Sequence, residues 1–371
     1  METSGTGEQR VIGPGGLDRL IGLLQEAGYQ TFGPTVRDEV IRLAPITGVS
    51  DLPRGIGDDT APGRYRLTSR SDGAYFGFAA PADSWKPHLF PPRQVLFSAI
   101  RTADGIRFRP VSPPPQRQAF IGVRGCDLAG IAILDEVLLH GDHPDPHYAA
   151  RRDGLFLVGA DCAHPAATCF CASMGTGPAV GPGADLVLTE LDPGTPRHRF
   201  LVTAPSQRGA EVLADVPHSP AGPPDLRAAA ALRESAEAAL VRQIPAGEWI
   251  PDPEDPRWSD VAQRCLACAN CTMACPTCFC VDINDTNDPV TGATQRSRAW
   301  GSCFEQRHSS LHGGPVRSSR ASRYRQWLTH KLLTWPEQFG TAGCVGCGRC
   351  IAWCPADIDI TEEAGALRRS S

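Results

Sequence analysis

Residues 265 to 280 of this 371-residue chain read Cys265-Leu-Ala-Cys268-Ala-Asn-Cys271-Thr-Met-Ala-Cys275-Pro-Thr-Cys-Phe-Cys280. The stretch holds six thiols in sixteen residues. Nothing at the N-terminus resembles a signal peptide, and the chain is far longer than small disulfide-stapled domains. The density of cysteine therefore predicts a metal site rather than a set of disulfides, and this site decides how the C-terminal part of the chain folds.

The spacing of these cysteines identifies the kind of metal site. The first four, with the proline, follow the pattern C-x2-C-x2-C-x3-C-P, and a second copy of this run ends at Pro355. In two-cluster bacterial ferredoxins the fourth cysteine of each run binds the cluster of the other run. We therefore expect two [4Fe-4S] clusters, the first held by Cys265, Cys268, Cys271 and Cys354, and the second by Cys344, Cys347, Cys350 and Cys275.

A pair of zinc sites is the alternative, because C-x2-C pairs also bind Zn²⁺ tetrahedrally. Zinc ribbons usually present two spaced pairs, whereas here three cysteines at i, i+3 and i+6 are followed by Cys-Pro, and the arrangement occurs twice. The doubled run favours iron-sulfur clusters over a zinc-organised scaffold.

Length, charge and hydropathy limit the kinds of function that the chain can have. The length is sufficient for two domains, and a net charge of -5 gives no reason to expect a nucleic-acid partner. No stretch approaches the roughly 18 apolar residues that a membrane span requires, so we expect a soluble, cytoplasmic protein. Lys86 and Lys331 are the only lysines among 36 basic residues, which we attribute to genomic base composition rather than to a recognition surface.

The sequence pattern of residues 1–245 predicts a mixed domain of α+β or α/β class. An amphipathic helix is expected over 17–24, ended by Gly28, and β-prone pieces without helix follow up to about residue 112. The later part predicts a β-hairpin and then an Ala-rich helix that begins at Asp225 and runs to about Gln243. The β-prone pieces are 64–68, 74–78 and 95–100, and the hairpin strands are 185–191 and 199–202.

Cysteines follow directly after the C-terminal ends of two predicted strands of this domain. Strand 119–124 precedes an apolar helix at 128–139, and strand 155–159 leads into a cysteine-rich loop. In open α/β sheets ligands gather at that edge, so these cysteines are candidates for a third metal site, with Asp127 or His164 as a substitute ligand. Buried cysteines that act only as small apolar residues are the alternative. The four candidates are Cys126, Cys162, Cys169 and Cys171.

Residues 246–257 are rich in proline and predict a linker. We expect residues 258–371 to form a helical, ferredoxin-like dicluster domain, with a long insertion at 276–343 between the two cysteine runs. Apolar and aromatic residues at helical spacing between Tyr324 and Trp335 predict an amphipathic helix that ends at Pro336.

Three further thiols, Cys278, Cys280 and Cys303, are interpreted as residues packed beside the clusters, where they would tune potential. His308, His312 and His330 are interpreted as surface or hydrogen-bonding residues. The tetrapeptide Thr-Cys-Phe-Cys occurs twice, at 168–171 and 277–280.

Several stretches together resemble a known family. They are Gly122-Val-Arg-Gly-Cys-Asp-Leu128, the Asp-Cys and Cys-Phe-Cys-Ala-Ser-Met-Gly segments of residues 161–175, Cys275-Pro-Thr-Cys-Phe-Cys280 and Gly343-Cys-Val-Gly-Cys-Gly-Arg-Cys350. They resemble the β subunit of cytoplasmic NiFe sulfhydrogenases and the related iron-sulfur subunit of anaerobic sulfite reductase, and the likeness covers most of the chain.

The resemblance implies a relay role. Such subunits use iron-sulfur clusters to relay electrons between a flavin subunit that uses NAD(P)H and a catalytic subunit, either the NiFe hydrogenase or a sirohaem sulfite reductase. No nucleophile-base pair, Walker loop or Rossmann glycine fingerprint occurs in the sequence, so we expect a non-catalytic electron-transfer subunit with flavin and nicotinamide on another chain. The alternative is an enzyme like heterodisulfide reductase, in which the N-terminal cysteine group itself reduces a substrate.

Overall fold

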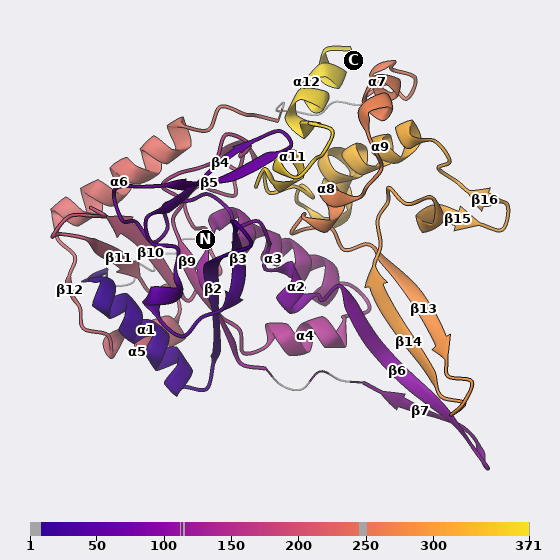
Figure 1. Cartoon of the computed structure of the whole chain (residues 1–371), viewed down its shortest axis with the longest axis horizontal. Coiled ribbons are helices and arrows are strands. Elements are labelled where there is room, and N and C mark those ends of the chain that lie inside the picture. The colour runs from indigo at the N-terminus through magenta and orange to yellow at the C-terminus, as the bar shows by residue number, and fades with distance from the viewer. Residues whose placement is uncertain (1–8, 112, 114–115, 245–250, 371) are drawn as a thin grey trace.

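The computed structural model describes residues 9–111, 113, 116–244 and 251–370, and its main layer is an eight-stranded sheet (Figure 1). The strands of this sheet are β1 (Arg10–Ile12), β2 (Gln30–Arg37), β3 (Val40–Pro45), β8 (Gln118–Val123), β9 (Phe156–Ala160), β10 (Leu186–Leu191), β11 (Arg199–Thr203) and β12 (Ser219–Pro220). Their order is β12-β1-β11-β10-β9-β8-β2-β3. The four strands from β10 to β2 run parallel, and the outer strands pair antiparallel.

Helices cover both faces of this sheet because successive strand residues point to opposite sides. Ala119 and Ile121 pack in a core with α1 (Pro14–Glu26) and α5 (Gln207–Ala214). Phe120, between them in sequence, packs in the core on the other face. That second core is formed with α2 (Lys86–Leu89), α3 (Gly125–Leu139) and α4 (Pro146–Arg152), while α6 (Pro223–Ala238) contacts β10 and β11.

These elements confirm most of the predicted ones. The helix over 17–24, the strands near 119–124 and 155–159, and the hairpin of β10 and β11 all form. Of the β-prone pieces, 64–68 lies in β5 (Arg64–Ser69), which pairs with β4 (Ile56–Ala61). The helix that was expected to reach about Gln243 ends at Ala238, and the short helix α2 interrupts a region that was predicted to contain none.

The predicted strand at 74–78 does not form. Instead, the Glu190 carboxylate accepts the backbone N–H groups of Tyr75 (2.8 Å) and Phe76 (2.9 Å), and Arg124 donates to the carbonyls of Phe76 and Phe78. Buried side chains thus satisfy backbone groups that a neighbouring strand would otherwise pair.

A four-stranded antiparallel sheet projects from the body as a long arm (Figure 1). It consists of β6 (Arg93–Thr102), β7 (Gly105–Pro110), β13 (Val281–Asn287) and β14 (Thr294–Trp300), in the order β13-β14-β6-β7. Because β14 pairs with β6, the insertion between the cysteine runs is joined to the N-terminal half of the chain.

The C-terminal region is mostly helical, as predicted. Its apolar core includes Trp258, Tyr324, Trp327 and Ile360, and also Phe170 from the N-terminal half. Its elements are α7 (Arg257–Arg264), α8 (Asn270–Met273), α9 (Arg320–Thr329), the π-helix η4 (His330–Thr334), α10 (Trp335–Phe339), α11 (Arg349–Ala352), α12 (Ile360–Ser370) and the hairpin β15 (Ser310–Leu311) and β16 (Gly314–Pro315). The described residues also form three 3₁₀ turns, η1 (Val49–Asp51), η2 (Ala172–Met174) and η3 (Gln306–Ser309).

Pro336 does not end the helix that was predicted to stop there. It lies in the first turn of α10, which follows the π-helix η4 without a gap and continues to Phe339. Residues 246–250 of the predicted linker lie outside the described residues. In the part of the chain that the structure describes, no helix is long and apolar enough to cross a membrane.

Candidate metal centres

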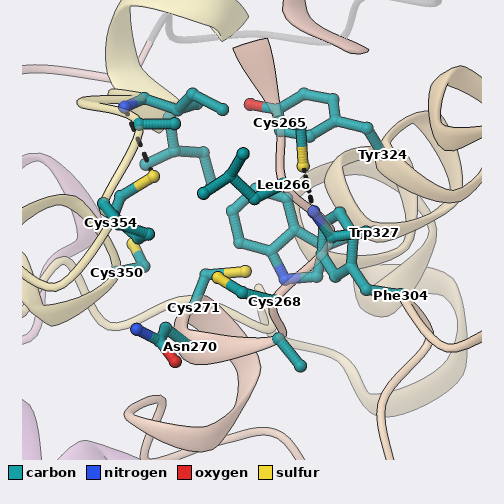
Figure 2. A pocket seen from close by; sticks show the side chains of 16 residues that line it. Cys265, Leu266, Cys268, Asn270, Cys271, Phe304, Tyr324, Trp327, Cys350 and Cys354 are labelled. Atoms are coloured by element: carbon teal, nitrogen blue, oxygen red, sulfur yellow. Dashed lines mark hydrogen bonds between the residues drawn. The ribbon is translucent and has the colours of Figure 1, made fainter. Parts of the chain in front are cut away.

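The first predicted ligand set surrounds one cavity with about 460 Å³ of free space (Figure 2). Cys265 ends α7, Cys271 lies in α8, and Cys354 reaches the cavity from the chain after α11. Figure 2 shows Cys354 across the cavity from Cys265. Cys268 is exposed, so this cavity lies near the surface.

The second predicted set surrounds another cavity. Its thiols belong to Cys275, Cys344, Cys347 and Cys350. Cys350 lines the first cavity as well, so the two cavities adjoin. The structure therefore brings together each of the two crossed sets, with Cys354 at the first cavity and Cys275 at the second.

The two cysteine runs share one backbone conformation. Ala267 (φ 52°) and Ala269 (φ 68°) in the first run, and Gly346 (φ 63°) and Gly348 (φ 74°) in the second, are all left-handed. These residues occupy equivalent positions, two and four residues after the first cysteine of each run. The repeated turn directs three thiols of each run into one cavity, as a cubane cluster requires.

Backbone N–H groups also face the thiols. Ala267 N lies 3.4 Å from the Sγ of Cys265, and Gly346 N lies 3.5 Å from the Sγ of Cys344. Such donors stabilise a thiolate. Burial nevertheless raises the pKa of the Cys344 thiol to about 12, so metal binding at this site has to release a proton.

Lys331 reaches the second cavity from the π-helix η4. Its Nζ is 3.3 Å from the Sγ of Cys275, 3.1 Å from the Oγ1 of Thr277 and 2.8 Å from the carbonyl of Gly343. Burial opposes its charge, but the cysteines around it, Cys275 first, hold the pKa of Lys331 well above its ordinary value. A permanent cation therefore lies in the wall of this cavity.

The second lysine of the chain lies beside the same cysteines. Lys86 Nζ donates to the carbonyl of Cys278 (3.1 Å) and lies 3.9 Å from the ring centroid of Trp300. Burial lowers the pKa of Lys86. Both lysines are 3 % exposed, a burial that base composition does not explain.

The four N-terminal candidates surround a third cavity. These cysteines are Cys126, Cys162, Cys169 and Cys171. Neither proposed substitute ligand lines this cavity. Asp127 accepts two hydrogen bonds from Arg349, at 2.8 and 2.9 Å, and the His164 ring lies 3.0 Å from Arg70.

The remaining predicted residues lie outside the walls of these three cavities. Cys278, Cys280 and Cys303 are half-buried, and Cys278 contacts Cys275. His308, His312 and His330 line none of the three. All fifteen cysteines are free thiols. Among the described residues, no three His, Cys, Asp or Glu side chains are grouped closely enough for a single metal ion.

Comparison with known proteins adds two findings. A family model described as a 4Fe-4S dicluster domain matches residues 264–358. The chain is also 37 % identical over 260 residues to the sulfhydrogenase 2 subunit beta of Pyrococcus furiosus, an alignment that covers 67 % of this chain and 73 % of that protein. No solved structure matches the chain significantly.

Proposed function

The chain belongs to the family of sulfhydrogenase β subunits and is an iron-sulfur electron-transfer subunit, and we propose that it relays electrons between the catalytic subunit of a cytoplasmic NiFe hydrogenase and a flavin subunit that uses NAD(P)H. The observation that carries this proposal is the pair of adjoining cavities, each lined by its four predicted cysteines, with Cys350 in the wall of both. Each cavity would hold one [4Fe-4S] cluster, the first on Cys265, Cys268, Cys271 and Cys354, the second on Cys275, Cys344, Cys347 and Cys350.

The surroundings of the cavities fit such clusters. A [4Fe-4S] cluster supplies one-electron transfer, and its potential depends on burial, hydrogen bonds and nearby charge. The first site lies near the surface, where Leu266 in its wall is 62 % exposed, while Cys344 and Cys275 of the second are buried. Electrons could thus enter or leave at the first site and pass inward to the second without crossing an intervening layer of protein.

The test separates the relay from the catalysis of its partner. In the purified complex, Cys268→Ser should abolish hydrogen evolution driven by NADPH, because the first site loses a ligand. Hydrogen evolution driven by reduced methyl viologen should continue, because the dye reduces the catalytic subunit directly. Cys280→Ser is the matched control, since Cys280 lines none of the three cavities, and both activities should persist in it.

Other outcomes would assign a different role. A purified complex with sirohaem absorbance and sulfite reduction in place of hydrogen evolution would identify the sulfite reductase partner. Turnover of a disulfide by the isolated chain with reduced viologen would identify an enzyme like heterodisulfide reductase. Retention of NADPH-driven hydrogen evolution by a Cys268→Ser complex that has lost cluster iron would refute the relay.

A further inference from the structure

The third cavity is built from separate pieces of the N-terminal half. Cys126 lies in the first turn of α3, directly after β8, and Cys162 follows β9, the parallel neighbour of β8. Cys169 and Cys171 flank the fully buried Phe170. All four cysteines are at least nine-tenths buried, and together they line one cavity.

The wall of this cavity carries a buried positive charge. Arg124 is 1 % exposed, and its guanidinium donates only to backbone carbonyls, including those of Ala79 (2.9 Å) and Asp161 (2.8 Å). Among the described residues, no carboxylate forms an ion pair with it. The nearby buried carboxylate of Asp58 feels the charge of Arg124 but makes no ion pair with it. A buried charge without a direct partner is costly, so an anionic occupant of the cavity would add to its compensation. An iron-sulfur cluster held by four thiolates carries net negative charge and supplies that compensation.

The third cavity also lies directly against the second. The Sγ of Cys169 is 3.7 Å from the carbonyl of Cys347, and the backbone N–H of Phe170 donates to the carbonyl of Gly346 at 2.8 Å. A Cβ added at Gly346 would lie 2.6 Å from the backbone of Phe170, and one at Gly348 would lie 2.5 Å from the carbonyl of Thr168. Glycine at these two positions therefore lets the two cysteine loops meet without side chains between them.

We propose that Cys126, Cys162, Cys169 and Cys171 hold a third [4Fe-4S] cluster, which follows the second in the electron path. The inference rests on the proposed relay function, which it extends. The path would run from the exposed Cys268, through the second site, to the third site beneath the loop that carries the exposed His164. Each transfer moves one electron and makes or breaks no bond, and a redox partner docked at either end supplies or removes it.

The test uses the tetrapeptide Thr-Cys-Phe-Cys, which occurs once in the proposed site and once outside it. Iron and acid-labile sulfide are measured on anaerobically prepared full-length chain, with EPR spectra after stepwise reduction. Three cubanes give about twelve iron per chain, and two give about eight. The variant Cys169→Ser with Cys171→Ser should lose about one third of the iron. The matched variant Cys278→Ser with Cys280→Ser should lose none.

About eight iron in the wild-type chain would overturn the proposal, whatever the variants do. An unchanged iron content in a folded Cys169→Ser and Cys171→Ser variant, checked by circular dichroism and gel filtration, would also overturn it. The iron content distinguishes a failure of this inference from a failure of the relay proposal. A wild-type chain with about twelve iron that fails to carry electrons from NADPH to the hydrogenase would refute the relay and leave the third site standing.

Discussion

The Nζ of Lys331 lies 3.3 Å from the Sγ of Cys275, in the wall of the second cavity. Reduction adds negative charge to a cluster, so a fixed cation beside one of its ligands favours the reduced form. The pair therefore sets the second site apart electrostatically from the first, which has no lysine in its wall.

Replacing Lys331 by Met should make the potential of the second site more negative. At a distance of about 5 Å and an effective dielectric constant of about 20, the loss of a unit charge corresponds to a shift on the order of 100 mV. Redox titration followed by EPR measures the shift, and the signal of the first site provides an internal reference. Lys331→Arg keeps the charge and should restore most of the potential, and an unchanged potential in Lys331→Met would contradict the assigned role.

Crossed ligation predicts which cluster remains when one cysteine is removed. Cys354→Ser should eliminate the site of the first run and leave the site beside Lys331, although Cys354 itself belongs to the second run. Cys275→Ser should eliminate the site beside Lys331 and leave the site of the first run. Combining each change with Lys331→Met identifies the surviving cluster, because only the cluster next to Lys331 should shift in potential. A shift in the Cys275→Ser background would show that each run binds its own cluster.

The sequence was sufficient to predict the cysteine sets because their spacing is a local property. Ligands three residues apart in one turn need no knowledge of the rest of the chain, and the structure groups Cys265, Cys268 and Cys271 at one cavity. The N-terminal cysteines were also predicted to meet, since they follow β8 and β9, and parallel neighbouring strands end at the same edge of a sheet.

Long-range contacts and local departures from regular structure were not predictable in this way. Asp127 was suggested as a ligand, yet it pairs with Arg349, which lies 222 residues away in sequence. Residues 74–78 have the composition of a strand, but their backbone groups form hydrogen bonds with the side chains of Glu190 and Arg124 instead of with a neighbouring strand. Helical spacing places Lys331 on the same face as the buried Trp327 and Leu328, but its contact with Cys275, 56 residues away in sequence, is long-range and not readable from that periodicity.

The close approach of the two cysteine loops predicts that Gly346→Ala is strongly destabilising. The residue has a φ of +63°, and its added Cβ would overlap the backbone of Phe170. Gly340→Ala is the matched control, because Gly340 has nearly the same φ, +68°, with no atom within 4 Å of the added Cβ. Left-handed strain costs both variants about 1–2 kcal/mol, and overlap adds roughly 1–3 kcal/mol in Gly346→Ala alone. Chemical unfolding of the two variants measures the difference, and equal losses would show that the loops are not in contact.

The buried pair of Asp127 and Arg349 predicts a large difference between single and double substitutions. Asp127→Ala leaves the guanidinium of Arg349 buried without its carboxylate, which should cost about 3–5 kcal/mol of unfolding free energy. The exposed pair of Asp59 and Arg64 is the control, and Asp59→Ala should cost no more than about 1 kcal/mol. Thermal and chemical unfolding under anaerobic conditions provide the comparison.

Removing both charges tests whether that loss arises from the unpaired guanidinium itself. Asp127→Leu combined with Arg349→Met should be more stable than Asp127→Ala, because no uncompensated buried charge remains. Recovery should be partial, since Arg349 also donates to the carbonyls of Pro81 (2.9 Å) and Asp83 (3.0 Å), and methionine leaves both without that donor. A double variant no more stable than Asp127→Ala would mean that Arg349 stabilises the fold mainly through the carbonyls of Pro81 and Asp83, which lie before α3, rather than through its ion pair with Asp127 in α3.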